Sequence, residues 1–478
     1  MNYRMIFRVT GMALMCLSGL LLLPLMAGLC YGENVLNFVI TIAVAALVGF
    51  VLTRLKPKTT EIYARDGFVA VGLVWVSMSL IGALPFVLNG DVSSYIDAVF
   101  ETVSGLTTTG ASVFTDIESL SRGNMFWRMF THWIGGMGVL VFIMAVLPMS
   151  GDHSMHIMRA EVPGPTVGKL VPRARKTAAI LYLIYMGLTV LETILLLCGG
   201  MSFYDALLHS FATAGTGGFS TRATSIAAFD SVYIEMVIAV FMLLFGVNFN
   251  LYFLLLIGRV KDVFKNEELR WYLCIIGGAV LVMALGIKDM YGSMGTALRH
   301  AFFNACTIIS TTGFGTVDFI QWPEYCKVII VLLMFCGGCA GSTGGGLKLS
   351  RVMMLIKGVI CDVREILRPR SVHRVMMDGR PVDRGVRQAV SVYFDLYIIS
   401  LLLLTFVISF DGYDFTTNFT AALSCLSNVG PGLGLIGPTG SFAIFSAPVK
   451  LLMSFAMLLG RLELYAILAL VFPKGRRG

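Results

Sequence analysis

The sequence predicts an all-α polytopic membrane protein. Of its 478 residues, 57% are apolar and 13% are charged, whereas an ordinary soluble domain carries about 25% charged residues. The mean hydropathy is +0.82, and unbroken apolar runs recur along the whole chain. Membrane β-barrels instead show weakly alternating segments of about ten residues. A soluble fold is therefore excluded, and a bundle of membrane-spanning helices is favoured.

About ten apolar runs approach the roughly 20 residues that one helical crossing of a bilayer needs. The first run follows Arg4 and Arg8, as the core of a secretory signal does, but it is longer than such a core and a second run follows at once. We therefore expect it to be retained as a span. The expected spans are approximately 5–29, 34–54, 68–89, 125–147, 177–199, 232–258, 269–288, 326–357, 388–410 and 446–472.

The basic residues indicate how these spans are oriented. If the N-terminus is cytoplasmic, 28 of the 36 Lys and Arg residues fall in cytoplasmic segments, as the positive-inside rule requires. The sequence thus predicts cytoplasmic N- and C-termini, and the net charge of +8 reflects loops beside membrane lipid rather than a nucleic-acid partner. The ten cysteines are scattered, which is typical of buried thiols and not of a disulfide framework.

Four apolar segments on the outer side are too short to cross, and each precedes a loop that contains glycine. Gly110, Gly218, Gly313 and Gly430 in these loops are 108, 95 and 117 residues apart, which indicates an internal repeat of span, short re-entrant helix, loop and span around one pore. The expected short helices are Tyr95–Leu106, Phe203–Thr213, Met294–Ser310 and Phe415–Ser427. The predicted units are an N-terminal transmembrane hairpin at 1–57 and four pore repeats at 58–165, 166–262, 263–384 and 385–478.

The four loops have the composition of a cation filter. Irregular backbone at membrane depth needs protein or water to satisfy its polar groups, and glycine allows a turn that directs successive carbonyls to one axis. Because the expected filter residues include no carboxylate, they favour a large, weakly hydrated cation over a divalent one. The alternative is that they are ordinary turns between spans. The expected filter residues are Thr108, Thr109, Gly110, Thr216, Gly217, Gly218, Thr311, Thr312, Gly313, Asn428, Val429 and Gly430.

The eighth expected span contains a second unusual segment, CGGCAGSTGGGLK at 336–348, with six glycines in thirteen positions. Such a segment does not form a stable helix, so we expect a break under the third filter loop, where it would obstruct the pathway. The alternative is close helix packing through small residues, and the Cys336–Cys339 pair is weak evidence for a metal. The expected gate residues here are Gly337, Gly338, Gly341, Ser342, Thr343, Gly344, Gly345, Gly346 and Lys348.

Arg461 lies inside the tenth expected span, where a charge is costly and usually faces a cavity. In a cation pathway a fixed positive charge is a barrier, so we expect Arg461 to form part of the gate. The alternative is a structural pairing with Glu463 or with a backbone carbonyl.

These motifs together resemble the TrkH/TrkG membrane subunits of bacterial potassium uptake systems, in the Trk/Ktr/HKT superfamily. The resemblance rests on the four loops, CAGSTGGGLK at 339–348, NVGPGLG at 428–434 and GRLE at 460–463. It implies K⁺ selectivity over Na⁺ at the four loop glycines, an intramembrane gating loop at 336–348 with Arg461 below the filter, and a location in the bacterial cytoplasmic membrane. Gly110 matches the K⁺-preferring form, whereas Asn428 and Val429 depart from the usual Thr-Thr-Gly pattern.

The resemblance also implies partners. It implies a homodimer in which each protomer holds its own pore, regulated by a TrkA-like cytosolic ring that binds NAD(H) or ATP/ADP. No phosphate-binding GxxxxGK[ST] motif occurs in this chain, so we expect no cofactor here, with K⁺ as the transported ion. The basic segment 351–387 is the expected dock for the ring, and an anionic-lipid or purely topogenic role is the alternative.

Three alternative functions are a coupled symporter, an enzyme and a receptor or scaffold. A K⁺/H⁺ or K⁺/Na⁺ symporter remains open, because Glu192, Glu235 and Asp395 are candidate intramembrane acids. An enzyme is not expected, since His153 and His156 lie in a predicted loop without further ligands. A receptor or scaffold that uses its basic loop is the third class.

Overall fold

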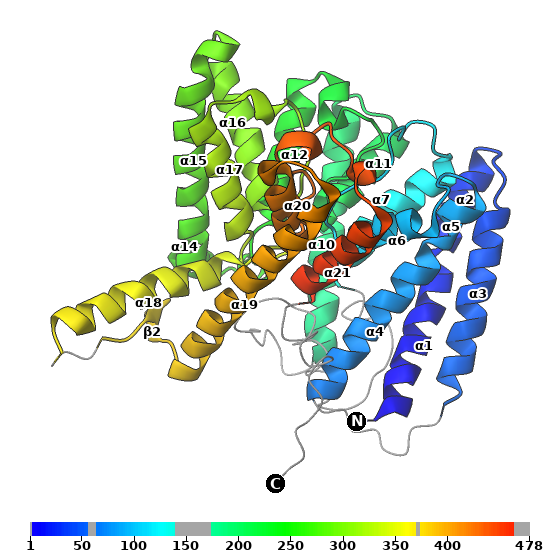
Figure 1. Cartoon of the computed structure of the whole chain (residues 1–478), viewed down its shortest axis with the longest axis horizontal. Helices are drawn as coiled ribbons and strands as arrows, with labels where there is room; N and C mark the ends of the chain where they lie inside the picture. The colour runs from blue at the N-terminus through cyan, green and yellow to red at the C-terminus, as the bar shows by residue number, and fades with distance from the viewer. Residues whose placement is uncertain (1, 56–63, 139–173, 370–372, 463–478) are drawn as a thin grey trace.

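The computed structural model describes residues 2–55, 64–138, 174–369 and 373–462. Within these ranges the chain is helical apart from loops and one antiparallel pair, β1 (Met376–Met377) with β2 (Arg380–Pro381), as Figure 1 shows. Six of the described helices are long and apolar enough to cross a membrane, and one bent pair would make a seventh. The predicted all-α membrane fold is therefore confirmed.

The helices follow one another as an N-terminal hairpin and four successive groups. The hairpin contains α1 (Tyr3–Leu20), α2 (Leu22–Cys30) and α3 (Leu36–Thr53). The first group contains α4 (Ala64–Gly82), α5 (Leu84–Leu88), α6 (Tyr95–Leu106) and α7 (Arg122–Gly136). The second contains α10 (Ala174–Cys198), α11 (Phe203–Gly215), α12 (Val232–Phe245), α13 (Phe249–Leu256) and α14 (Val260–Lys265). The third contains α15 (Glu267–Tyr291), α16 (Met294–Ile309), α17 (Glu324–Cys336) and α18 (Leu349–Leu367). The fourth contains α19 (Arg384–Ile408), α20 (Phe415–Ser427) and α21 (Ala447–Arg461).

The hairpin is held together by close backbone contact. A Cβ added at Gly11 would lie 2.8 Å from the Gly49 carbonyl oxygen, and one at Gly49 would lie 2.9 Å from that of Gly11, so α1 and α3 cross at two glycines. The loop between α2 and α3 also reaches the first group. Its Glu33 carboxylate accepts hydrogen bonds from the Arg122 and Gly123 amides at 2.6 and 3.0 Å, and this satisfies otherwise unpaired N–H groups at the start of α7.

The four short helices occur where the sequence predicts them. Helices α6 and α20 have the expected bounds, α11 ends two residues later than expected, and α16 ends one residue earlier. The first turns of α6, α11 and α20 are capped by the side chains of Ser94, Ser202 and Asp414, respectively, which are favoured N-cap residues. These caps set the starts of the helices, and the glycine loops follow their ends.

The predicted span at 232–258 is not one continuous helix. Helices α12 and α13 meet at an angle of 93° across residues 246–248. The break is stabilised by the glycine-rich segment, because the Cys339 amide donates to the Gly246 carbonyl at 2.9 Å and the Thr343 hydroxyl donates to that of Phe245 at 3.2 Å. Asn248 caps the second helix by accepting from the Asn250 amide at 2.9 Å.

The expected break in the eighth span is present. Helix α17 ends at Cys336, residues 337–348 are irregular, and α18 begins at Leu349. In Figure 1, α18 (yellow) runs obliquely away from the upright helices α15 and α17. The expected spans 125–147 and 446–472 are described only as far as α7 and α21, because their remaining residues lie outside the described ranges.

Candidate functional site

The four glycine loops have the same backbone conformation. Each begins with a non-glycine residue in the left-handed region, and two residues later comes a glycine that also has positive φ. A β-branched residue is rarely left-handed, and such strain, about 1–3 kcal/mol each, is concentrated at functional sites. The φ values are 56°, 56°, 60° and 55° at Thr108, Thr216, Thr311 and Asn428, and 81°, 73°, 86° and 101° at Gly110, Gly218, Gly313 and Gly430.

The residue between these two positions is held in the same way in each loop. Its amide donates to a carbonyl of the preceding short helix, five residues back, as in a helix C-terminal cap. These bonds are Thr109 to Ser104 at 2.8 Å, Gly217 to Ala212 at 2.9 Å, Thr312 to Thr307 at 2.8 Å and Val429 to Ser424 at 3.0 Å. The amides are thus tied back to the helices, which leaves the carbonyls of the same residues for other contacts.

Those carbonyls close the loops into a ring. Each loop glycine lies against the carbonyl oxygen of the following loop, and the fourth glycine lies against the first loop. A Cβ on any of them would therefore meet that oxygen at less than van der Waals distance. The distances from such a Cβ are 2.0 Å from Gly110 to the Gly217 oxygen, 2.0 Å from Gly218 to that of Thr312, 2.2 Å from Gly313 to that of Val429 and 2.7 Å from Gly430 to that of Thr109.

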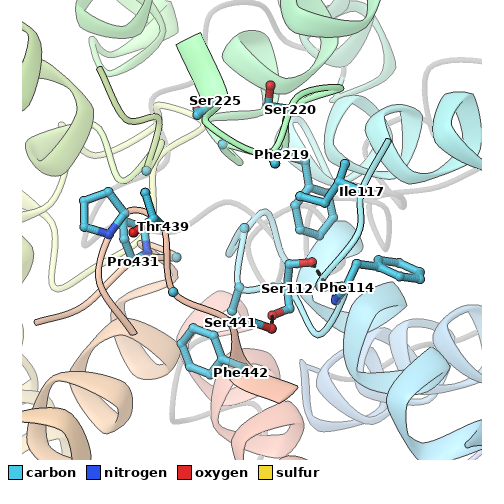
Figure 2. A pocket seen from close by; sticks show the side chains of 18 of the residues that line it. Ser112, Phe114, Ile117, Phe219, Ser220, Ser225, Pro431, Thr439, Ser441 and Phe442 are labelled. Atoms are coloured by element: carbon cyan, nitrogen blue, oxygen red, sulfur yellow. Dashed lines mark hydrogen bonds between the residues drawn. The ribbon is translucent and has the colours of Figure 1, made fainter. Parts of the chain in front are cut away.

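A cavity of about 310 Å³ lies on one side of the ring. All four loop glycines line it, together with residues that follow them in the chain, and Figure 2 shows side chains of the first, second and fourth loops around it. Arg128 and Arg222 are the ionisable residues in this lining, which contains no carboxylate among the described residues.

A buried ion pair packs against the first and second loops of the ring. Arg128 on α7 lies 2.7 Å from Glu101 on α6, and the two side chains are 2% and 0% exposed. The Arg128 guanidinium also donates to the Ser220 carbonyl at 3.1 Å and lies 3.6 Å from the centre of the Phe219 ring. Glu101 accepts from the Val113 amide at 2.9 Å, so the pair joins the first and second loops. The sequence does not reveal this role, because Arg128 and Glu101 are 27 residues apart in the chain and meet only in the folded structure.

Glu101→Gln is expected to destabilise the fold by about 3–5 kcal/mol, because it leaves the buried Arg128 guanidinium without a counter-charge. The matched control is Glu118→Gln, since Glu118 is 53% exposed and lies 3.9 Å from Arg222, where a pair contributes about 1 kcal/mol or less. Thermal unfolding in detergent measures both. Equal melting temperatures for the two variants would contradict a supporting role for the pair.

His132 on α7 supports the second loop. Its Nε2 accepts from the Phe219 amide at 3.2 Å, and its Nδ1 lies 2.8 Å from the Gly105 carbonyl. This network assigns a neutral imidazole with the proton on Nδ1. A Cβ at Gly217 would lie 2.3 Å from the ring, so histidine and loop are in close contact.

The glycine-rich segment 337–348 lies against the third and fourth loops, at the residues that precede their glycines. The Gly345 amide donates to the Thr311 hydroxyl at 2.6 Å, and a Cβ at Gly345 would lie 2.4 Å from the Ser427 carbonyl oxygen. The 310 Å³ cavity instead contacts the glycines and the residues that follow them. The segment, called the intramembrane loop below, therefore contacts the side of the ring that faces away from this cavity.

Arg461 links the intramembrane loop to the C-terminal end of α7. Its guanidinium donates to the Thr343 carbonyl at 2.7 Å and to the carbonyls of Gly135 and Gly136 on α7 at 2.6 and 2.7 Å. The carbonyl pairing considered from the sequence is thus present, whereas Glu463 lies outside the described residues. A second, separate cavity lies beside Arg461. Its volume is only about 10 Å³, which is the space of about one water molecule.

The remaining expected site residues have varied surroundings. The Asn428 side chain donates to the Thr109 hydroxyl at 3.0 Å and to the Met457 carbonyl at 2.9 Å, so the departure from threonine adds a cross-link between loops. Lys348 is buried and donates to the Gly344 carbonyl. Glu192 is buried, Glu235 pairs with Arg299 at 3.3 Å, and Asp395 is exposed.

Metal ligands of the usual kind are not grouped in the described part of the chain. No cluster of three or more His, Cys, Asp or Glu residues occurs there, and both Cys336 and Cys339 are free thiols. His153 and His156 lie outside the described residues. The arrangement therefore offers backbone carbonyls and hydroxyls, which are ligands for a weakly hydrated monovalent cation.

Comparisons by family profile, by sequence and by structure all match this chain to cation or potassium transport proteins. The TrkH family profile, described as a cation transport protein, matches residues 33–476. The chain is 36% identical to the Trk system potassium uptake protein TrkH of Salmonella typhimurium over 99% of both chains, and 33% identical to TrkG of Escherichia coli K12 over 98% of both. It is also similar to the crystal structure of the potassium transporter TrkH from Vibrio parahaemolyticus, with a TM-score of 0.89, 32% identity and 99% coverage of both chains.

Proposed function

The chain belongs to the TrkH family of cation transport proteins, and from this premise we propose that it is the K⁺-translocating subunit of a Trk-type uptake system. It is a multi-pass protein of the inner membrane and a transporter rather than an enzyme. The printed names of its relatives support K⁺ as the transported ion.

The observation that carries the proposal is the closed ring of four loops. K⁺ would pass along the axis of the ring, where carbonyls and threonine hydroxyls replace part of its hydration shell. The close contact between each glycine and the next loop holds the ring at one size. Selection then follows from the number and placement of these oxygen ligands, and the absence of carboxylates among the expected filter residues disfavours divalent ions.

We assign the closed gate to the intramembrane loop and Arg461. Three carbonyls from two sides of the pathway converge on one guanidinium, and a desolvated cation there repels a permeating cation. Opening requires the loop to leave the ring. The contacts with Thr311 and Thr343 are therefore those that an opening stimulus has to break.

The proposed assembly is a homodimer with one pore in each protomer and a TrkA-like cytosolic ring that binds the nucleotide. The basic segment 351–387 supports this assignment of the docking site, since it contains nine Lys and Arg residues and follows the positive-inside rule for a cytoplasmic segment. Nucleotide control would then act through the partner, while K⁺ is the cargo of this chain.

Deleting residues 364–384 is expected to abolish stimulation by the partner and to leave a folded pore with its basal flux, because the deletion removes the docking segment but no part of the ring. Partner binding is measured by co-purification, and ⁸⁶Rb⁺ uptake into liposomes measures the flux. Intact partner binding after the deletion would contradict docking at this segment.

The proposed function is tested by expression in bacteria that lack their own K⁺ uptake systems. We expect growth at limiting K⁺ together with ⁸⁶Rb⁺ uptake when the chain and its cytosolic partner are both present. Expression at the normal level without either growth or uptake would contradict the proposal. A coupled symporter is the second candidate, and the buried Glu192 on α10 is the observation that favours it.

A further inference from the structure

We propose that Glu268 is the latch that holds the intramembrane loop closed, and that the cytoplasmic hairpin at 376–381 transmits the partner's signal to this latch. This inference deepens the proposed function and rests on it, because its readout is K⁺ or Rb⁺ flux. Glu268 is not among the residues that the sequence motifs point to.

One carboxylate oxygen of Glu268 fastens two separate points. Glu268 lies in the first turn of α15 and is 6% exposed. Its Oε1 accepts from the Ala340 amide at 2.7 Å and from the Ser350 amide at 3.1 Å. Ala340 is inside the intramembrane loop and Ser350 is in the first turn of α18, so the same atom joins the loop to the helix that follows it.

The contact with Ser350 is a helix cap supplied by another helix. The first amides of an α-helix have no partner within it, and a negative charge is favoured at that end. Lys348, at the N-cap position of α18, makes no capping bond with its side chain. Glu268 provides the acceptor instead, and the start of α18 is thereby held against α15.

The residues next to Glu268 hold the hairpin. The Glu267 amide donates to the Asp378 carboxylate at 2.7 Å, and the Asn266 side chain donates to the same carboxylate at 3.2 Å. Lys357 on α18 pairs with the Glu267 carboxylate and donates to the Met376 carbonyl at 2.8 Å. The hairpin therefore contacts the turn that carries the latch.

This arrangement gives a path from the cytoplasmic surface to the gate. A partner that displaces the hairpin moves residues 266–267, and with them Glu268, relative to α18. Ala340 and Ser350 are both buried, so each amide needs a hydrogen-bond acceptor, either the Glu268 oxygen or a new one. Positions of Glu268 that leave these amides without an acceptor are unfavourable. Such a two-state element is what physical coupling between distant sites requires.

The latch is tested with two pairs of variants in proteoliposomes. Glu268→Ala is compared with Glu324→Ala, because Glu324 is also a glutamate in the first turn of a helix but pairs with Lys327 on the same helix. Ser350→Pro removes the amide that Glu268 binds, and the first turn of a helix tolerates proline. Ser350→Ala is its control, since the buried Ser350 hydroxyl has no hydrogen-bond partner and the amide is retained.

We expect Glu268→Ala and Ser350→Pro to raise ⁸⁶Rb⁺ flux without the partner by tenfold or more and to reduce the further stimulation by the partner. Glu268→Gln should give a smaller increase, because its amide oxygen still accepts but carries no charge. Asp378→Ala should retain low basal flux and partner binding while losing at least half of the stimulation. Glu324→Ala and Ser350→Ala should behave as wild type.

The outcomes separate the two proposals. If the wild type conducts with its partner, but Ser350→Pro and Glu268→Gln are folded and show unchanged basal flux and stimulation, the latch is overturned and the proposed function stands. If the wild type with its partner carries no K⁺ or Rb⁺ under any condition, the proposed function itself fails. Size-exclusion profiles and melting temperatures identify folded variants, and Ser350→Pro provides the test if Glu268→Ala does not fold.

Discussion

Replacing Gly313 with serine is expected to lower the K⁺ over Na⁺ permeability ratio by about tenfold or more. Gly313 has a φ of +86°, and a Cβ there would lie 2.2 Å from the Val429 carbonyl oxygen. The third and fourth loops therefore have to separate, which enlarges the ring and changes its oxygen positions. A tenfold change in the permeability ratio corresponds to a change of only about 1.4 kcal/mol in the free energy that separates K⁺ from Na⁺. Displacing one carbonyl ligand is expected to change this free energy by more.

The prediction is checked by reversal potentials in K⁺ and Na⁺ gradients. Gly110→Ser should act in the same direction, because its Cβ would meet the Gly217 oxygen at 2.0 Å. Gly277→Ser on α15 is the matched control, since it has open space around it and is exposed on the helix surface. Unchanged selectivity in both ring variants would contradict the filter assignment.

Arg461→Ala is expected to raise basal flux by about 100-fold. The guanidinium makes three hydrogen bonds to carbonyls on two sides of the pathway, and hydrogen bonds to charged groups contribute about 1.5–3 kcal/mol each. Losing the equivalent of about 3 kcal/mol shifts a closed-to-open equilibrium by about two orders of magnitude. The change also removes the positive charge that opposes a permeating cation.

Flux without the cytosolic partner measures this effect. Arg461→Lys is the conservative comparison, and we expect an intermediate increase because an ammonium keeps the charge but lacks the planar fork that contacts both sides at once. Wild-type basal flux and wild-type stimulation in Arg461→Ala would remove Arg461 from the gate.

Much of the helical fold is predictable from local sequence. The short helix α6 has the predicted bounds, because an N-cap serine and a following glycine loop mark both of its ends. The break between α12 and α13 is not predictable in this way. The run 232–258 is long enough to span without a break, although Gly246, Asn248 and Asn250 lie near its centre. The carbonyls freed at Phe245 and Gly246 find their partners in the intramembrane loop, more than 90 residues later.

Only some residues of the candidate site could likewise be predicted from the sequence. The loop glycines could be found because their repetition is visible in the sequence, although their contacts with the next loop's carbonyls come from the structure. Glu101, Arg128 and Glu268 could not be assigned, since the partners of each are fixed by tertiary packing. The available signal was a charged residue at the edge of an apolar run, which does not distinguish a buried support from a surface charge.

The most direct test of a K⁺-selective ring is the reversal potential of the current through the purified protein with its partner in a planar bilayer. K⁺, Na⁺ and pH gradients are imposed separately. A K⁺-selective ring gives a current that reverses at the K⁺ equilibrium potential and does not shift with the Na⁺ or pH gradient. A reversal potential that follows the Na⁺ or proton gradient would contradict a K⁺-selective ring and would indicate coupled transport.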